Sequence, residues 1–446
     1  MTRIGLLVLL ALSSCVPAGV PPRVPAPSDI PRLQQLLLRD SADLAARVSL
    51  AVAYRAGGRL DEARSLLERL VAERPDEPGA WLLLGLTQEE SADWRGARAS
   101  YDRYLGLAQA TELRRAIERR LPWVRRKELE AEVRSSLEHE ADLSATAPDP
   151  ARIAVFPFVL QSADTALRPL SRAIAELLVT DLAVTGRLQV LERAQVQLLL
   201  DEIALAESGA VDPATAARGG RLLRAGRVVQ GSIEGNQARL RLAAVVGRAG
   251  RDSLTGLSPV REEDAIARLF DMEKNLALSL HARLGIELTV AERQRVLQRP
   301  TGNLQALLAF GSGLEAEDRG DWAAATTHYA RAAAIDPTFA PAATRSEAAA
   351  GIADAERTRV EVLVATGVTE QAIPVSTPPQ HPALDGLRST PLTLGLGQTA
   401  GSVLVPDPIR GIVPDPLQRD AGAEALGREG VSSRTVLRII FRRPGN

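Results

Sequence analysis

The side chain best suited to covalent chemistry is Cys15, the only cysteine in a chain of 446 residues. In an exported protein a single cysteine has no intramolecular disulfide partner, so its thiol must serve another purpose. The four histidines lie far apart, and none has a histidine, a cysteine or paired carboxylates at metal-ligand spacing. We therefore expect neither a metal site nor a bound cofactor.

Sequence patterns typical of catalysis do not hold in this chain. We searched for a phosphate-binding glycine loop with a following lysine, Gly-x-Ser-x-Gly, Ser-x-x-Lys and His-Glu-x-x-His. Glu192 and Arg193 are adjacent at a strand end, so their side chains point to opposite faces and cannot serve one substrate as acid and base. We expect them to form an edge ion pair or a helix-start cap. The prediction is no catalytic residue and no enzyme.

The amino terminus gives Cys15 a use. Arg3 and the apolar stretch Ile4–Leu12 are typical of an export signal, and the stretch is too short to span a bilayer. It ends in Leu-Ser-Ser-Cys, which resembles the bacterial lipobox and implies a lipid on Cys15. The alternative is an ordinary secretory signal whose cleavage site happens to contain a cysteine. We expect residues 1–15 to be a lipoprotein signal peptide.

Several acyl chains on one cysteine attach a protein firmly to a membrane, because each buried methylene contributes about 0.8 kcal/mol. Val16 follows the cysteine where an aspartate would retain the protein at the inner membrane, so the resemblance implies an outer-membrane anchor facing the periplasm. Six prolines between Pro17 and Pro31 predict an extended tether, assigned to residues 16–40. The formal charge of -1 gives no reason to expect a nucleic-acid partner.

Residues 41–145 contain a repeat with a period of 34 residues. Four positions recur at this spacing, Leu50, Ala51, Ala63 and Leu67 as Leu84, Gly85, Ala97 and Tyr101. The pattern resembles tetratricopeptide (TPR) repeats, in which small residues let antiparallel helices pack closely. The resemblance implies a groove that binds a protein or peptide partner. Apolar spacing over 113–137 predicts a capping helix with a kink or break near Pro122, and the basic cluster over 119–127 predicts a solvated face.

A further copy of the pattern lies in residues 300–365. The matching positions of a repeat over 306–339 are occupied by Gly313, Gly320, Tyr329 and Pro337. About three repeats are needed to bury a continuous core. We therefore expect this copy to pack on a following helix over Ala340–Ile352 or on the preceding domain.

Residues 151–290 alternate strand and helix patterns, which predicts an α/β layer. The expected strands cover 152–158, 188–191, 227–234, 238–246 and, more weakly, 252–258; the expected helices cover 167–185, 193–206, 213–226 and 262–284. Gly235-Asn236 is a hairpin turn signal, and Gly231 predicts a bulge or a close backbone approach. The fold class is thus α+β multidomain, with helical repeats flanking a central α/β domain and a disordered carboxyl-terminal tail.

Three motifs of this central segment resemble the CsgG family and the related TolB-amino-terminal-like domains: Arg152–Phe158 (RIAVFPF), Val190–Arg193 (VLER) and Val228–Ile233 (VVQGSI). In that family a ring of subunits lets curli subunits out through a pore made by long insertions between strands. Here Glu234–Gln237 is too short for such an insertion, and 247–259 is too short and too glycine-rich. The resemblance therefore implies a periplasmic scaffold, with homo-oligomerisation left open.

The remaining segment, residues 366–446, is rich in proline, glycine, serine and threonine, which predicts a low-complexity tail with one short strand over Thr435–Phe441. Taken together, the sequence predicts a non-catalytic envelope lipoprotein that acts as an interaction or assembly scaffold. The alternative is an oligomeric component of a CsgG-type outer-membrane secretion channel for curli or other proteins.

Overall fold

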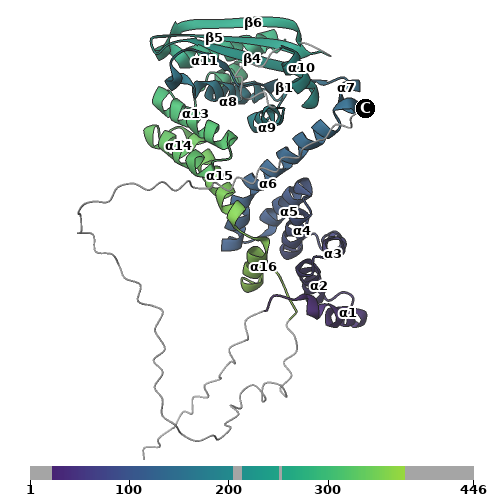
Figure 1. Ribbon diagram of the computed structural model, residues 1–446. Coiled ribbons are helices and arrows are strands. Elements are labelled where there is room, and N and C mark those ends of the chain that lie inside the picture. Colours follow the sequence, from purple (N-terminus) through teal and green to yellow (C-terminus); the bar gives the residue numbers. More distant parts are fainter. Residues whose placement is uncertain (1–22, 204–212, 251–253, 377–446) are drawn as a thin grey trace, which may run out of the picture. The chain divides into compact units, whose positions relative to one another are not determined.

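The computed structural model describes residues 23–203, 213–250 and 254–376 (Figure 1). Cys15 and the strand predicted over Thr435–Phe441 lie outside these residues. Within them the predicted fold class is confirmed, because helical repeats flank a mixed sheet on both sides along the sequence.

The amino-terminal repeats are helix pairs with the predicted close packing. Their helices are α1 (Ile30–Arg39), α2 (Leu44–Ala56), α3 (Leu60–Glu73), α4 (Pro78–Glu90) and α5 (Trp94–Leu107). Gly85 lets α4 approach α5, since a Cβ there would lie 2.6 Å from the ring of Tyr101. Asp43 and Asp93 cap α2 and α5 by accepting hydrogen bonds from backbone amides in the first turn.

The tether predicted over 16–40 is wrong for residues 30–39, which form α1. Leu33 is fully buried, and Gln34 donates a hydrogen bond to the Tyr54 hydroxyl at 3.0 Å. The prolines gave a misleading signal because Pro31 stands in the first turn of α1, where a proline costs no hydrogen bond.

Helix α6 (Glu112–Glu138) runs without interruption through Pro122, so of the predicted kink or break the break does not occur. Its first half packs into the repeat core through Ile117 and Val124, and its second half packs beneath the central sheet through Leu129 and Val133. Burial on both sides of the proline offsets the roughly 3 kcal/mol that an interior proline costs a helix. One continuous helix is therefore shared by the repeats and the central domain (Figure 1).

The central domain contains a six-stranded sheet in the order β3-β1-β4-β5-β6, with β2 paired to β4. Its strands are β1 (Asp149–Val155), β2 (Val159–Gln161), β3 (Gln189–Val190), β4 (Ala225–Gly235), β5 (Arg239–Ala249) and β6 (Leu254–Ala265). Pairs involving β1 to β3 are parallel, whereas β4, β5 and β6 are antiparallel. The predicted turn is confirmed: Gly235 has φ of 116°, and Asn236 accepts hydrogen bonds from the amides of Ala238 and Arg239.

Two predicted boundaries in this domain are wrong. Strand β6 extends to Ala265, so the helix expected to start at Glu262 begins at Leu269 as α11 (Leu269–Arg283). The acidic end of β6 stays in the sheet because Glu263 pairs with Arg239 and Arg241 on β5. The helix expected to reach Gly226 ends at Leu222, because β4 begins at Ala225.

Alternate residues of the parallel strands enter two cores. Ile153 and Val155 face α8 (Leu170–Ala183) and α11, while Ala154 and Phe156 face α9 (Arg193–Glu202), α10 (Pro213–Leu222) and α6. Helices on both faces explain why the first strand reads as an unbroken apolar run. Gly231 makes the predicted close approach, since a Cβ there would lie 2.2 Å from the Phe158 ring.

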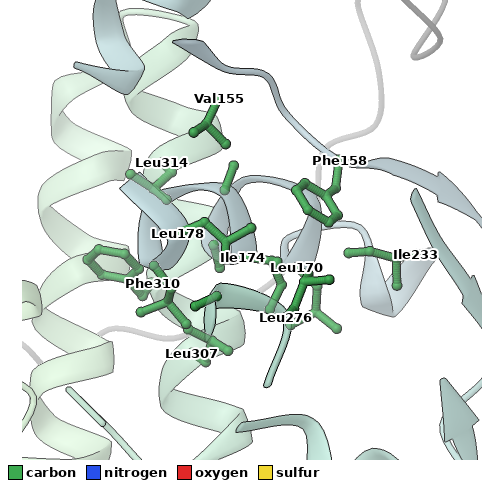
Figure 2. Close-up of a cluster of buried hydrophobic side chains, with 14 of the residues drawn as sticks. Val155, Phe158, Leu170, Ile174, Leu178, Ile233, Leu276, Leu307, Phe310 and Leu314 are labelled. Atoms are coloured by element: carbon green, nitrogen blue, oxygen red, sulfur yellow. The ribbon is translucent and has the colours of Figure 1, made fainter. Parts of the chain in front are cut away.

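The later repeat packs on both of the supports that the sequence predicted. It comprises α13 (Leu304–Asp318) and α14 (Trp322–Ile335), followed by α15 (Ala340–Arg357) and α16 (Val360–Thr369); α12 (Val290–Val296) precedes them. Figure 2 shows Leu307, Phe310 and Leu314 of α13 beside Ile174 and Leu178 of α8, so the repeat shares the core of the central domain.

The predicted tail starts later than residue 366, because α16 continues to Thr369 and Ile373 is buried. Of the helices in the described ranges, none is both long enough and apolar enough to cross a membrane.

Candidate interaction site

The face formed by α2, α4 and α6 is covered by the segment that follows the later repeat. We call this segment, residues 360–376, the return segment. Ser376 donates its backbone N–H to the Ser49 hydroxyl at 2.7 Å, and the Leu113 amide donates to the Glu370 carboxylate at 3.4 Å. Five apolar side chains of the return segment are buried in the repeat core: Val360, Leu363, Val364, Val368 and Ile373.

The return segment explains why the first helix of each pair is buried almost all round. Every residue of α2 from Ala46 to Arg55 is buried, and Gly79 on α4 stands against the Ala372 carbonyl, where a Cβ would lie at 2.5 Å. The groove predicted to be open for a partner is therefore closed by the chain itself. A cavity of about 210 Å³ between Arg55, Glu90 and Glu361 remains beside it.

A buried ion pair fixes α6 to its neighbours. Arg120 donates to both oxygens of Glu89 at 2.6 and 2.8 Å and to the backbone carbonyls of Ala355 and Thr358. Burial and the Glu89 carboxylate raise the pKa of the Tyr101 phenol, so its O–H remains to donate to Glu89 at 2.8 Å. The basic cluster predicted to be a solvated face is thus partly buried, and it joins α4, α6 and α15.

A second buried network joins the central domain to the later repeat. Arg193, at the start of α9, is 1% exposed and lies 2.6 Å from Asp318, 3.2 Å from Glu317 and 3.4 Å from Glu176. Burial alone would raise the pKa of Glu317, but Arg345 and Arg193 outweigh it and hold that pKa below the ordinary range. All these carboxylates have guanidinium partners, as buried charges require.

Glu192 and Arg193 bind different partners, and they do not form the predicted edge pair or helix-start cap. Glu192 pairs with Arg125 of α6, with Arg125 Nε at 3.0 Å, and its side chain makes no capping hydrogen bond. Arg193 belongs to the buried network with Asp318, Glu317 and Glu176. No sequence signal could reveal this role, because Asp318 lies 125 residues along the chain.

A cleft of about 820 Å³ lies between α5 and α6 on one side and β3 and α9 on the other. One wall of the cleft, the repeat wall, is lined by Trp94, Arg95, Glu128 and Glu132. The opposite wall, the domain wall, is lined by Arg152, Gln189, Val190, Glu192, Gln195 and Arg224. Trp94 stacks edge-on against Trp123, with ring centroids 5.3 Å apart. The cleft is mostly polar and open to solvent, which suits a peptide better than an enclosed small molecule.

Sequence reasoning also missed a charged cluster inside the central domain. Lys274 Nζ lies 2.7 Å from Asp181 and 3.2 Å from Glu273, and His281 is fully buried nearby on α11. Burial, with the neighbouring Asp181, raises the pKa of Glu273 well above its ordinary value. No group of three or more histidine, cysteine, aspartate or glutamate side chains suited to a metal ion occurs in the part of the chain that the structure describes.

Comparisons with known proteins give matches in both the amino-terminal repeats and the central domain. Residues 136–241 match the family model of the curli production assembly/transport component CsgG, and residues 30–86 match a tetratricopeptide-repeat model. The cellulose synthase operon protein C of Xanthomonas axonopodis pv. citri (strain 306) is 36% identical over 85 residues. These residues are 18% of this chain and 6% of that relative, so the chain matches only a small part of its length.

Repeats of this type bind proteins through extended surfaces, and the two matched families together indicate a role in protein interaction or assembly. The two resemblances predicted from the sequence are therefore confirmed within the matched residues: 30–86 match tetratricopeptide repeats, and 136–241 match CsgG.

Proposed function

We propose that this protein is a non-catalytic lipoprotein of the cell envelope that holds a protein partner in the cleft between its repeats and its CsgG-family domain. The observation that carries the proposal is the composition of the cleft, which takes one wall from each of the two regions. A partner bound there would contact both regions at once, as an assembly scaffold requires.

Rigidity of the walls supports this role. Helix α6 belongs to both cores, and the pairs of Arg120 with Glu89 and of Arg193 with Asp318 fix its surroundings. A preformed cleft binds its partner without losing the free energy of ordering its own walls. The return segment closes the other candidate surface, so a partner of the α2–α4–α6 face would first have to displace it.

Photo-crosslinking in the intact cell tests the cleft. A photoreactive amino acid replaces Arg95 on the repeat wall, Gln189 on the domain wall or, as the control, the exposed Arg319 at the end of α13. We expect one protein adduct of the same mass from both walls and none from the control. Different adducts from the two walls, or an equal yield from Arg319, would contradict a shared partner.

The envelope anchor rests on Cys15 and its lipobox resemblance. Labelled palmitate should enter the wild-type protein and not the Cys15→Ser variant, and only the wild-type protein should fractionate with the outer membrane. Label that persists in Cys15→Ser would place the lipid elsewhere, and wild-type protein without label would rule out lipidation.

A second candidate is a subunit of a secretion channel, which the match to a curli assembly/transport component favours. The two functions differ in the number of copies that associate, because a channel of this kind needs a ring of subunits. The mass of the detergent-extracted protein therefore distinguishes the two functions.

A further inference from the structure

Charges on the cleft are unevenly paired. Each carboxylate on its lining has a guanidinium partner: Asp93 has Arg64 at 2.9 Å, Glu128 has Arg98 at 2.8 Å, Glu132 has Arg95 at 2.8 Å, and Glu192 has Arg125. Two arginines on the domain wall, Arg152 and Arg224, form no ion pair with any described residue. On the domain wall Arg152 and Arg224 thus lack the direct ion pair that each lining carboxylate has, and Asp149 and Glu132 attract Arg152 only from a greater distance.

The two unpaired arginines lie together. Arg152 is on β1, and Arg224 immediately precedes β4, where its carbonyl accepts the Asp149 amide of β1 at 3.2 Å. Burial and the proximity of Arg224 lower the pKa of the Arg152 guanidinium, and they outweigh the attraction of Asp149 and Glu132. The Nε of Arg152 is buried without a hydrogen-bond partner. A buried donor without an acceptor is costly, so this pair of side chains is suited to receive an anion.

The same wall presents a sheet edge. Strand β3 is the last strand on its side of the sheet, and Gln189, Val190 and Leu191 line the cleft. The Leu191 amide donates to the Ile153 carbonyl of β1 at 2.9 Å. Because backbone groups alternate along a strand, the N–H and C=O of Val190 point away from β1. An extended chain could pair with them, as in other complexes in which a peptide adds a strand to a sheet edge.

We propose that the cleft binds an extended acidic segment of the partner, which pairs with the β3 edge at Val190 and places a carboxylate between Arg152 and Arg224. This inference rests on the proposed function, because it specifies the chemistry of the partner held in the cleft. The guanidinium groups without an ion pair select against a neutral or basic segment, and the Val190 backbone groups that point away from β1 select for an extended one.

Fluorescence polarisation with two labelled synthetic octapeptides tests the charge requirement. One alternates glutamate with valine and the other alternates glutamine with valine, and each is titrated with the full-length protein in detergent. We expect the acidic peptide to bind about tenfold more tightly or better, with an affinity that falls as salt rises. Equal affinities for the two peptides would overturn the proposal. The acidic peptide methylated on its backbone nitrogens should lose binding, and unchanged binding would exclude pairing with the β3 edge.

Two variants identify the arginines responsible. The double variant Arg152→Gln/Arg224→Gln should lose about tenfold or more in affinity for the acidic peptide, whereas Arg357→Gln, an exposed arginine on α15, should bind it unchanged. The reversed variant Arg152→Glu/Arg224→Glu should gain binding to an octapeptide that alternates lysine with valine. This gain cannot come from misfolding, and its absence in a variant with wild-type thermal unfolding would contradict the assignment.

Crosslinking separates the two proposals. If Arg95 and Gln189 give adducts in the intact cell but the protein shows no preference for the acidic peptide, the cleft remains the partner site. Only the proposal of an acidic segment is then refuted. Loss of the adducts themselves would refute the proposed function on which this inference rests.

Discussion

Replacing Arg193 by methionine should destabilise the protein more than any surface substitution, because it leaves three carboxylates without one of their cationic partners. The guanidinium is 1% exposed and lies 2.6 Å from Asp318, 3.2 Å from Glu317 and 3.4 Å from Glu176. Removing one partner of a buried ion pair costs about 3 to 5 kcal/mol, since the remaining charge stays buried. Methionine keeps most of the volume, so the cavity contribution is small.

Urea unfolding followed by tryptophan fluorescence and circular dichroism measures this cost. With an m value of about 3 kcal/mol/M, the midpoint should fall by roughly 1 M or more at unchanged m. Arg357→Met is the matched control, because Arg357 is 72% exposed and pairs with an exposed Asp354; its midpoint should move little.

A second substitution tests the reason for the loss. Asp318→Asn in the Arg193→Met background removes the carboxylate nearest to the missing cation, so it should restore part of the stability. The reasoning is refuted if Arg193→Met unfolds at the wild-type midpoint, or if Asp318→Asn lowers the stability of the double variant further.

Three other substitutions test the remaining structural assignments. Ile373→Asp places a charge in the core under the return segment and should release that segment, measured as faster amide hydrogen exchange in α4 with β5 unchanged. Glu273→Gln should stabilise the protein at neutral pH, because burial raises the pKa of Glu273 in the folded state. The free energy of unfolding of the wild type should therefore fall as the pH rises above the ordinary glutamate pKa. Urea titrations at several pH values should show this decrease in the wild type and not in the variant. Gly231→Val should lower the thermal midpoint by driving a side chain into Phe158, while Gly302→Ala, with open space around it, should not.

The sequence predicts the elements whose signals are local. The 34-residue period identifies the helix pairs because small residues such as Gly85 and Gly313 must face large aromatic rings, and both glycines do so. The apolar run of β1 and the Gly235 turn define the start of the sheet and its hairpin for the same reason. The predicted ends of elements are wrong where strand pairing outweighs the preference of the local sequence for a helix, as at the acidic end of β6.

The features that form the candidate site depend on contacts between distant residues, and these leave no local pattern. The return segment covers the repeats through contacts such as that of Leu113 with Glu370, which are 257 positions apart. Arg120 belongs to a basic run that looks solvated until Glu89, 31 positions earlier, is placed against it. Arg152 and Arg224 become neighbours only when β1 and β4 pair.

The mass of the full-length protein extracted in detergent, measured by light scattering coupled to size-exclusion chromatography, tests most directly whether the protein is a scaffold or a channel subunit. After subtraction of the detergent, we expect one or two copies of the chain, whose mass is 47.6 kDa before the predicted signal peptide is removed, with the cleft accessible to a partner. A ring of many copies that also conducts ions across a planar bilayer would contradict the scaffold and establish the channel.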